Sequence, residues 1–473
     1  MFDAKRAETE AIAFLRKESL DLYNRLHSIA EDILFVNQVH EAYPGIPILP
    51  NLRCGAWYTD PAIATDCPTY FKSTDGHFSN WSFNLRRPNL HLLPLVAAQD
   101  GTGIILVDST RAGKRIPDAL SKTVPIWCAV VNRAIARVFP GKVNWDTHLY
   151  TPPGAVSGQE HDQIAQRLDA WADALANSSY TLPDLRCPLR PVWITPATSR
   201  FPVFDRAFIP MICLSASKQA QDGVERRSGG FTYVQGSGDD HELWGMGLTP
   251  DMFWGHRGAI LTADRSQLPA LIASIVAAES HAHAHGSATP IAKVHGRVLV
   301  CAVADLPPNL DLETWEQGVS HVIVGAGFSL SLPATIPMLR IETWEGKKGQ
   351  IQFLQDVLPR ATSFIESQLL AGSRVCVSCD TGTDTSVGIA LVALQAFFDD
   401  SGELRVGERG QNATKQSIRT RLEWIITSRP EANPSRTTLK RVNEFLLSSS
   451  AFRAPSTKPF PPSHVKIPAR GPA

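Results

Sequence analysis

One stretch decides the fold of the C-terminal half of this chain: Val377-Ser378-Cys379-Asp380-Thr381-Gly382-Thr383-Asp384-Thr385-Ser386-Val387-Gly388. It continues an apolar run typical of a buried strand and opens a helix that we predict over residues 387–398. A glycine loop between a strand and a helix directs backbone N–H groups into a concavity at the helix N-terminus. We therefore predict a phosphate-binding loop built from Ser378, Cys379, Asp380, Thr381, Gly382, Thr383, Asp384, Thr385 and Ser386.

Strands and helices alternate on both sides of this loop. The pattern predicts strands at 297–303, 321–324 and 375–378, and helices at 311–318 and 350–370. Such alternation is typical of an α/β domain with a parallel central sheet and flanking helices. We assign this domain to residues 296–455, followed by a basic, proline-rich tail at 456–473.

The first 280 residues predict a second, mixed α/β domain. Apolar residues at helical spacing predict helices at 5–39, 158–176 and 268–278, whereas short apolar runs at 94–97 and 103–107 are typical of buried strands. A stretch of small and polar residues at 281–295 is interpreted as a linker. Alternating histidines in it (His281, His283 and His285) are compatible with a metal site on an extended chain, but a solvated linker is the favoured interpretation.

Composition excludes several classes of protein. The 473 residues contain 46 Lys+Arg and 46 Asp+Glu, so the chain is no bulk polycation that holds nucleic acid by overall charge. No run of 18 apolar residues predicts a membrane span, and the polar N-terminus does not resemble a signal peptide. Cys376 and Cys379 are two residues apart, but no second pair completes a metal site. We expect a monomer in the cytoplasm, with the nucleus as an alternative.

The C-terminal loop resembles that of the dual-specificity protein phosphatases, in which Cys-x5-Arg builds the nucleophile and the phosphate loop. Two positions depart from that pattern. Ser378 precedes the cysteine where His is usual, and Thr385 stands where the arginine is expected. Without the arginine, the bidentate clamp on a transferring phosphoryl group is missing. The loop is therefore predicted to bind an anion through its backbone, without hydrolysis.

Polar clusters in the N-terminal half carry the remaining candidates. Arg53 lies in the first, at 51–58, and the densest cluster is at 70–87. Interleaved donors, aromatics and arginines suit phosphate and a stacked base, and the alternative is a surface hairpin with solvated charges. The candidates in the densest cluster are Lys72, Ser73, Thr74, Asp75, Gly76, His77, Asn80, Arg86 and Arg87.

Two further clusters follow apolar runs. Residues 104–115 end a strand in Asp108 and continue with Ser109, Thr110, Arg111 and Lys114, in the layout of a phosphoribosyl-diphosphate loop but with one carboxylate instead of two. This is not a Walker A loop. Residues 233–244 place glycines before Asp239, Asp240, His241 and Glu242, which suits Mg²⁺ or a general base. The alternative for this cluster is an acidic turn that caps a helix.

Four long motifs together resemble the initiator tRNA phosphoribosyl transferase family of fungi and plants. They are FKSTDGHFSNWSFNLRRPNLHLL, GIILVDSTRAGKRIPDALSKTVPIWCAVVNRA, YVQGSGDDHELW and CDTGTDTSVGIAL, in this order over nearly the whole chain. The resemblance implies transfer of a 5-phosphoribosyl group from 5-phosphoribosyl 1-diphosphate to the ribose 2′-hydroxyl of the purine at position 64 of initiator tRNA. Pyrophosphate is released, and the tRNA is marked against use in elongation. The family shares the arginine-less phosphatase-like loop.

The resemblance also implies roles for the clustered residues. Mg²⁺ would be held by Asp239 and Asp240, and His77 or a carboxylate would serve as base. The catalytic candidates are Asp75, His77, Asp108, Asp239, Asp240 and Glu242; the substrate-binding candidates are Arg53, Lys72, Ser73, Thr74, Gly76, Asn80, Arg86, Arg87, Ser109, Thr110, Arg111 and Lys114. Two other classes stay open, a cysteine-dependent phosphatase built on Cys379 and a non-catalytic tRNA-binding protein.

Overall fold

The computed structural model divides the chain into two compact units, residues 1–283 and 284–473. It describes residues 13–51, 54–98, 102–111, 113–142, 144–204, 207–279, 288–306, 318–325, 336–344, 346–405 and 413–448. The predicted linker begins outside these ranges, at 281–287, and the predicted tail at 456–473 lies outside them entirely.

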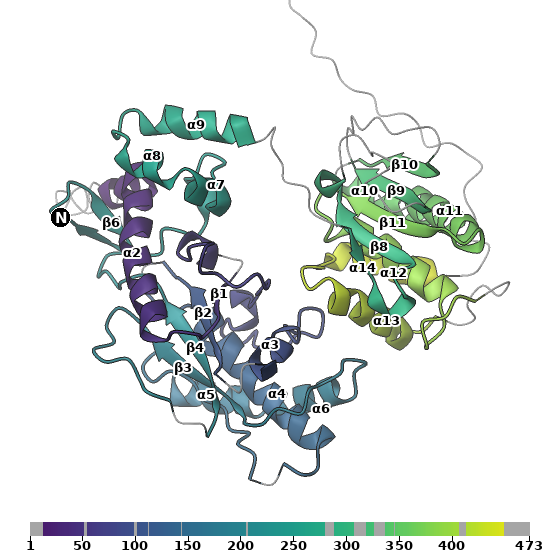
Figure 1. Cartoon of the computed structure of the whole chain (residues 1–473), viewed down its shortest axis with the longest axis horizontal. Helices are drawn as coiled ribbons and strands as arrows, with labels where there is room; N and C mark the ends of the chain where they lie inside the picture. The colour runs from purple at the N-terminus through teal and green to yellow at the C-terminus, as the bar shows by residue number, and fades with distance from the viewer. Residues whose placement is uncertain are drawn as a thin grey trace, which may run out of the picture. The chain divides into compact units, whose positions relative to one another are not determined.

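A parallel sheet forms the centre of the N-terminal unit (Figure 1). Its order is β1-β2-β4-β3, and all three neighbouring pairs run parallel. The strands are β1 (Ile48–Pro50), β2 (Ile104–Asp108), β3 (Leu189–Ile194) and β4 (Ile209–Ser215). A two-stranded antiparallel ribbon stands apart from this sheet, formed by β5 (Val224–Arg226) and β6 (Thr232–Val234).

Helices cover both faces of this sheet because its strands are apolar on both sides. In β2, Ile104 and Leu106 pack into one core, and Ile105 and Val107 into the other, as the two-residue side-chain period requires. The first core is closed by α3 (Leu92–Ala98), α4 (Val124–Val138), α5 (Gly158–Ala165) and α6 (Leu168–Ala176). The second is closed by α2 (Leu22–Ala42), α7 (Pro250–Gly255), α8 (Arg257–Thr262) and α9 (Leu268–Glu279).

Three sequence predictions in this unit were wrong. The predicted helix at 5–39 is interrupted, since residues 13–20 are helical and α2 begins only after Asp21, whose carboxylate accepts from the Asn24 backbone N–H at 2.9 Å. The run at 94–97 belongs to α3 and not to a strand, because a short apolar run does not distinguish the two. The predicted helix at 158–176 is two helices, α5 and α6.

The C-terminal unit contains a second sheet, in the order β10-β9-β11-β8-β7. Its four longer strands are parallel, and β7 (Thr289–Pro290) adds an antiparallel edge. They are β8 (Val298–Ala302), β9 (Val319–Gly325), β10 (Met338–Glu342) and β11 (Arg374–Cys379). The helices are α10 (Gly346–Gln352), α11 (Leu358–Leu370), α12 (Thr385–Phe397), α13 (Lys415–Ser428) and α14 (Arg436–Leu447).

The predicted α/β architecture of this unit is confirmed. The predicted strands correspond to β8, β9 and β11, and the last of them leads through the loop into α12. One face of the sheet packs against α11, α12, α13 and α14 in a single apolar core. Residues 311–317 of the predicted helix at 311–318 lie outside the described residues. Within the part of the chain that the structure describes, no helix is both long enough and apolar enough to cross a bilayer.

Candidate functional site

The carboxyl edge of the N-terminal sheet collects the polar residues that follow its strands. Parallel strands end at the same edge, and ligands of open α/β sheets bind there. Asn51 follows β1, Ser109 and Thr110 follow β2, and Ser217 lies two residues beyond β4. These side chains come from distant parts of the sequence and are brought together by the sheet alone.

Asp108 ends β2 as a fully buried carboxylate. Its Oδ2 accepts from Asn51 Nδ2 at 2.9 Å, and its Oδ1 accepts from Cys54 Sγ at 2.7 Å and from the Ser109 backbone N–H at 2.8 Å. Asn51 also bonds both backbone polar groups of Phe71. The predicted catalytic residue Asp108 is therefore bound into the fold, where it fixes the segments that carry Cys54 and Phe71 beside β2.

A buried hydroxyl and carboxylate chain lies next to it. Ser109 Oγ and Ser217 Oγ are 2.6 Å apart, and Ser217 donates to Asp32 Oδ2 of α2 at 2.6 Å. Tyr233 donates to the other oxygen of Asp32 at 2.9 Å. Burial raises the pKa of Asp32 to about 8, against the opposing hydrogen bonds from Ser217 and Tyr233. Sequence analysis missed Asp32 because a single carboxylate on an amphipathic helix gives no sign of its burial.

The glycine-rich loop at 233–244 closes over the segment that follows β2. A Cβ on Gly236, whose φ is +67°, would lie 2.4 Å from the Thr110 carbonyl oxygen, so only glycine fits this contact. Gln235 Nε2 donates to the carbonyls of Thr110, Arg111 and Lys114. Asp240 adopts a left-handed conformation before the short 3₁₀ helix His241–Leu243. Its carboxylate makes no cap bond to that helix.

Arg111 faces the two aspartates predicted to hold a metal. Its Nη1 is 2.6 Å from Asp240 Oδ2, and its Nε is 3.6 Å from Asp239 Oδ2. Glu242, the third carboxylate, is exposed. Within the described residues no three His, Cys, Asp or Glu side chains gather as metal ligands. The residues present therefore do not fit a resident metal centre, because a guanidinium already neutralises the pair.

The densest predicted cluster is held by an internal ion pair. Arg87 donates to both oxygens of Asp75, at 3.0 and 2.9 Å, and Ser82 Oγ adds a bond at 3.2 Å. Phe71 and Trp81 anchor the segment in the core. A Cβ on Gly76 would lie 2.7 Å from the Asp118 carbonyl oxygen, so this segment packs directly against the helical segment at 118–123 that leads into α4. Residues 70–87, all described, contain no strand, so the hairpin alternative is wrong.

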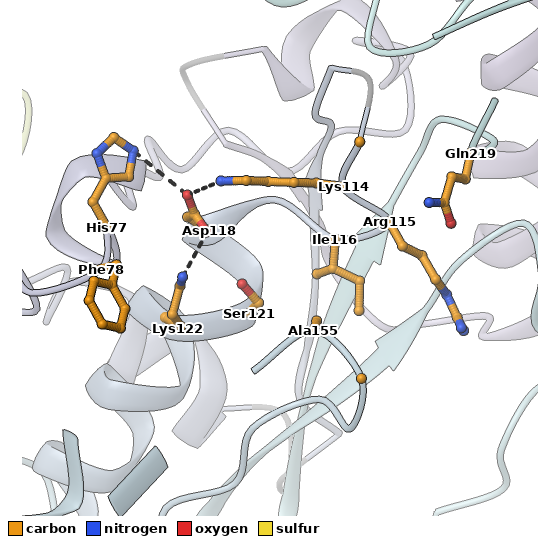
Figure 2. A pocket seen from close by; sticks show the side chains of 12 residues that line it. His77, Phe78, Lys114, Arg115, Ile116, Asp118, Ser121, Lys122, Ala155 and Gln219 are labelled. Atoms are coloured by element: carbon orange, nitrogen blue, oxygen red, sulfur yellow. Dashed lines mark hydrogen bonds and ion pairs between the residues drawn. The ribbon is translucent and has the colours of Figure 1, made fainter. Parts of the chain in front are cut away.

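A cavity of about 730 Å³ opens where these segments meet (Figure 2). Two predicted residues, His77 and Lys114, line it. The other residues of its wall come from the segment after β2, the turn after β4, the loop before α5 and the tip of the densest cluster. They are Phe78, Gly113, Arg115, Ile116, Asp118, Ser121, Lys122, Gly154, Ala155 and Gln219.

Asp118 is the centre of the cavity's charged network (Figure 2). Lys114 Nζ lies 2.5 Å from its Oδ2, Lys122 Nζ lies 2.9 Å from its Oδ1, and His77 Nε2 lies 3.7 Å away. Burial alone would raise the pKa of the Asp118 carboxyl, but the hydrogen bonds and charges of Lys114 and Lys122 outweigh it and hold this pKa below its ordinary value. Asp118 is therefore ionised at neutral pH and orients both lysines.

Positive charge dominates the lining of this cavity. The lining contains three cations, Lys114, Arg115 and Lys122, against one carboxylate, Asp118, and His77 adds an imidazole ring. Such a wall suits a ligand that carries phosphate groups. Sequence analysis missed Arg115, Asp118, Ser121, Lys122 and Gln219. The spacing of Lys114, Asp118 and Lys122, four residues apart after a predicted strand, was the available signal, since opposite charges at this spacing often pair.

The other predicted substrate-binding residues lie around this region. The Lys72 backbone carbonyl accepts from Thr123 Oγ1 at 3.1 Å, and Ser73 Oγ is buried with no hydrogen-bond partner among the described residues. Thr74 and Asn80 are exposed, and Arg86 is half-buried. Arg53 lies outside the described residues.

An arginine outside the motif, Arg429, contacts the predicted phosphate loop of the C-terminal unit. Arg429 Nε donates to the Gly382 carbonyl at 3.0 Å, and its Nη1 donates to Thr289 Oγ1 at 2.7 Å. Gly382 has a φ of +66°, and a Cβ there would lie 2.5 Å from the Ala302 backbone nitrogen. Arg429 is buried and serves as a structural support for the loop.

Cys379 lies at the start of this loop and is buried. Its Sγ is 3.1 Å from Ser386 Oγ at the first turn of α12. Thr383 and Asp384 are held by the segment after α13, through the Asn433 N–H at 2.9 Å and the Ser435 N–H at 2.8 Å. Thr381 bonds Thr383 within the loop, and Asp380 is exposed. The loop thus has the predicted strand–loop–helix geometry, with two carboxylates of its own.

These features define an α/β protein of two units, with a cationic cavity at the carboxyl edge of a parallel sheet and a phosphatase-like loop that lacks its arginine. The chain belongs to the Rit1 family. The Rit1 N-terminal domain matches residues 15–277, and the Rit1 DUSP-like domain matches residues 337–446.

Two relatives span nearly the whole chain. The tRNA A64-2'-O-ribosylphosphate transferase of Saccharomyces cerevisiae is 34% identical and covers 92% of this chain and 93% of its own length. An uncharacterised protein of Schizosaccharomyces pombe is also 34% identical, over 91% of this chain and 95% of its own.

Solved structures similar to the chain are phosphatase-like. The crystal structure of DUSP15 covers 35% of this chain and 92% of its own, at 20% identity and a TM-score of 0.27. That of the human tyrosine phosphatase-like serine/threonine/tyrosine-interacting protein covers 34% and 95%, at 13% identity and a TM-score of 0.26.

Proposed function

We propose that this protein transfers a 5-phosphoribosyl group from 5-phosphoribosyl 1-diphosphate to the 2′-hydroxyl of the nucleotide at position 64 of initiator tRNA. The observation that carries the proposal is the cationic cavity at the sheet edge, because most of its wall, including all of its charged residues, comes from two of the motifs shared with the tRNA ribosylphosphate transferase family. The transferase of Saccharomyces cerevisiae supports the acceptor, since it is similar over nearly its full length.

The reaction is a glycosyl transfer with three requirements. The bond between C1 of the ribose and the diphosphate oxygen breaks, with its electron pair leaving on the diphosphate, and a new bond forms between C1 and the acceptor O2′. The transition state carries positive charge on the ribose and growing negative charge on the leaving group. The protein must therefore neutralise diphosphate, hold the 5-phosphate and accept one proton.

Lys114, Arg115 and Lys122 meet the first two requirements in this proposal. Lys122 is 7% exposed and is held between Asp118 Oδ1 and Glu160 Oε1, at 2.9 and 3.2 Å, so it is fixed in one position. Lys114 is half exposed and reaches over the cavity. A buried and a half-exposed ammonium group, both held by Asp118, offer preorganised stabilisation of phosphate.

His77 is the proposed base for the 2′-hydroxyl proton. Its side chain is half exposed on the cavity wall, and its Nε2 lies 3.7 Å from Asp118. A carboxylate at this distance can orient the imidazole ring toward the acceptor hydroxyl. Asp108, by contrast, is fully buried and bonded to its neighbours, so in this proposal it has a positioning role.

In this proposal Mg²⁺ would bind together with the donor, 5-phosphoribosyl 1-diphosphate. In proteins Mg²⁺ is held by substrate phosphates with one or two carboxylates and keeps several of its waters. When bound to the diphosphate it would supply charge neutralisation. No step of the mechanism above requires a metal bound to the protein alone.

The test is incubation of the protein with initiator tRNA and labelled 5-phosphoribosyl 1-diphosphate. We expect label in the tRNA when Mg²⁺ is present and none in excess chelator. Elongator tRNA serves as the matched acceptor control. If tRNA binds but the donor is never consumed, the protein is a non-catalytic tRNA-binding protein and the proposal is wrong.

A phosphatase is the second candidate, and the structure gives it no support. Thr385 occupies the position of the phosphate-clamping arginine. Arg429, which lies beside the loop, donates to the backbone carbonyl of Gly382. Release of phosphate from an aryl phosphate that is lost in Cys379→Ser would favour this candidate over the transferase.

A further inference from the structure

Phe78 is a large apolar side chain at the rim of the cationic cavity. It is 66% exposed, although it lines the same cavity as Lys114 and Lys122 (Figure 2). It sits on a tight turn, in which the Asn80 N–H donates to the His77 carbonyl at 2.9 Å. Ser79 in that turn has a φ of +64°, an uncommon conformation for a residue other than glycine. The turn therefore presents the ring to solvent.

The Phe78 ring packs against a buried tryptophan, Trp81. Phe78 meets Trp81 edge to face, with ring centroids 5.4 Å apart and planes at 78°. Trp81 is 3% exposed, and its Nε1 donates to buried Glu160 at 3.0 Å. Glu160 in turn contacts Lys122 of the cavity wall at 3.2 Å. Phe78 is thus fixed relative to the lysine that is proposed to hold phosphate.

A cation flanks the same tryptophan. The guanidinium of Arg167, an exposed residue, lies 5.0 Å from the Trp81 ring centroid. Phe78 and Arg167 thus both contact Trp81, and both are exposed. Aromatic rings and arginines are the residues that RNA sites use for stacking and for phosphate contact. We call Phe78, Trp81 and Arg167 the rim patch.

We infer that the rim patch binds the acceptor RNA, with the Phe78 ring packed against the acceptor nucleotide while the donor occupies the cavity. This inference rests on the proposed function of the cavity. The acceptor must bring its 2′-hydroxyl to the mouth of the cavity, and the rim is where its ribose and base arrive. An apolar ring there contacts a ribose face in a shallow minor groove or the face of an unstacked base.

The experiment compares Phe78→Ala, Phe78→Leu and Phe78→Tyr with the parent. Leu34→Ala is the matched control, because Leu34 is also 66% exposed and lies on α2. Binding of labelled initiator tRNA is measured without donor, and KM is measured for each substrate separately. We expect Phe78→Ala to weaken tRNA binding and raise KM for tRNA by roughly 5- to 150-fold, with KM for the donor and the thermal midpoint unchanged. The control should match the parent.

The other two variants identify the contacted face. Near-parental binding by Phe78→Leu assigns the contact to ribose, and rescue by Phe78→Tyr alone assigns it to a base. Arg167→Ala should reduce the slope of log affinity against log salt by about one. Unchanged tRNA affinity in Phe78→Ala would overturn the inference. A parent that binds tRNA through Phe78 but transfers no label would instead overturn the proposed function alone.

Discussion

Arg87 donates two parallel hydrogen bonds to the carboxylate of Asp75, at 3.0 and 2.9 Å, and both side chains are nearly buried. Sequence analysis assigned Asp75 to catalysis and Arg87 to the substrate. Their geometry makes each the partner of the other, because a bidentate pair uses both oxygens of the carboxylate. The pair fixes the segment that carries His77 and Phe78 to the cavity.

Removal of Arg87 is expected to reduce stability. Arg87→Ala leaves the buried Asp75 carboxylate without its cation, which we expect to lower the free energy of unfolding by about 3 kcal/mol. Thermal and denaturant unfolding measure this. The slope of tRNA affinity against salt should stay at the parental value, since this guanidinium is committed to Asp75.

Arg86→Ala is the neighbouring control for that change. Arg86 is half-buried. We expect this variant to lose less stability than Arg87→Ala and to reduce the slope of log tRNA affinity against log salt by about one, as a lost phosphate contact would. An equal loss of stability in both variants would contradict the assignment of the Asp75 pair to structure.

Lys114 is expected to bind the donor. Lys114→Ala removes a charged donor from the cavity wall, so KM for 5-phosphoribosyl 1-diphosphate should rise by roughly 10- to 150-fold. Lys218→Ala is the matched control, because its side chain is 51% exposed against 54% for Lys114 and pairs with Glu225 outside the cavity. An unchanged donor KM in Lys114→Ala would remove this lysine from the site.

Asp32 should make stability depend on pH. Its pKa is about 8 in the folded protein, above its ordinary value of 3.8, so the folded state binds the extra proton. The stabilisation from this group is therefore full below about pH 4 and is lost as pH rises toward 8, by at most about 1.4 kcal/mol per pH unit.

The isosteric variant Asp32→Asn isolates this effect. It should remove the contribution between pH 4 and 8 while other titrating groups stay as they are. Unfolding free energies of parent and variant, measured across this range, should therefore converge or cross as the pH rises. A constant difference between them at every pH would show that Asp32 does not titrate in this window.

Cys379 is expected to be dispensable as a nucleophile. Cys379→Ser keeps the size of a buried side chain and its contact with Ser386, so transfer of label to tRNA should stay within about twofold of the parent. Steady-state rates at saturating donor and tRNA measure this. Loss of transfer in a folded serine variant would give the thiol a chemical role.

Gly382 is expected to be essential to the packing of the loop. A methyl group at Gly382 would lie 2.5 Å from the Ala302 backbone nitrogen and 2.9 Å from Arg429, whereas Gly372 has a similar φ of +82° but open space around it. Both alanine variants incur backbone strain of about 1–2 kcal/mol, and Gly382→Ala adds a clash with backbone. Its thermal midpoint should fall clearly below that of Gly372→Ala; equal midpoints would contradict the close approach.

The sequence by itself determined the α/β class of this protein, several of its strands and helices, and the motifs that place it in its family. The apolar runs at 103–107 and 375–378 predict strands because they are short, rich in β-branched residues and bounded by turn-forming residues. The loop from Ser378 to Ser386 is a local strand–loop–helix unit, so its place between a strand and a helix could be predicted from adjacent residues, whereas Arg429 and Ser435, which bond it, could not. The order of four motifs was sufficient for the family, which the matches to both Rit1 domains confirm.

Only the tertiary structure decided which of these polar residues share a site. Asp75 pairs with Arg87, Asp108 with Asn51, and Arg111 with the aspartates of a loop more than a hundred residues away. The cavity instead brings His77 and Lys114 together with Asp118 and Lys122. Asp32, on a helix near the start of the sequence, accepts a hydrogen bond from Ser217. Buried charges need partners, and the packing of the whole chain decides which charges come close enough to pair. A local sequence pattern does not contain this information.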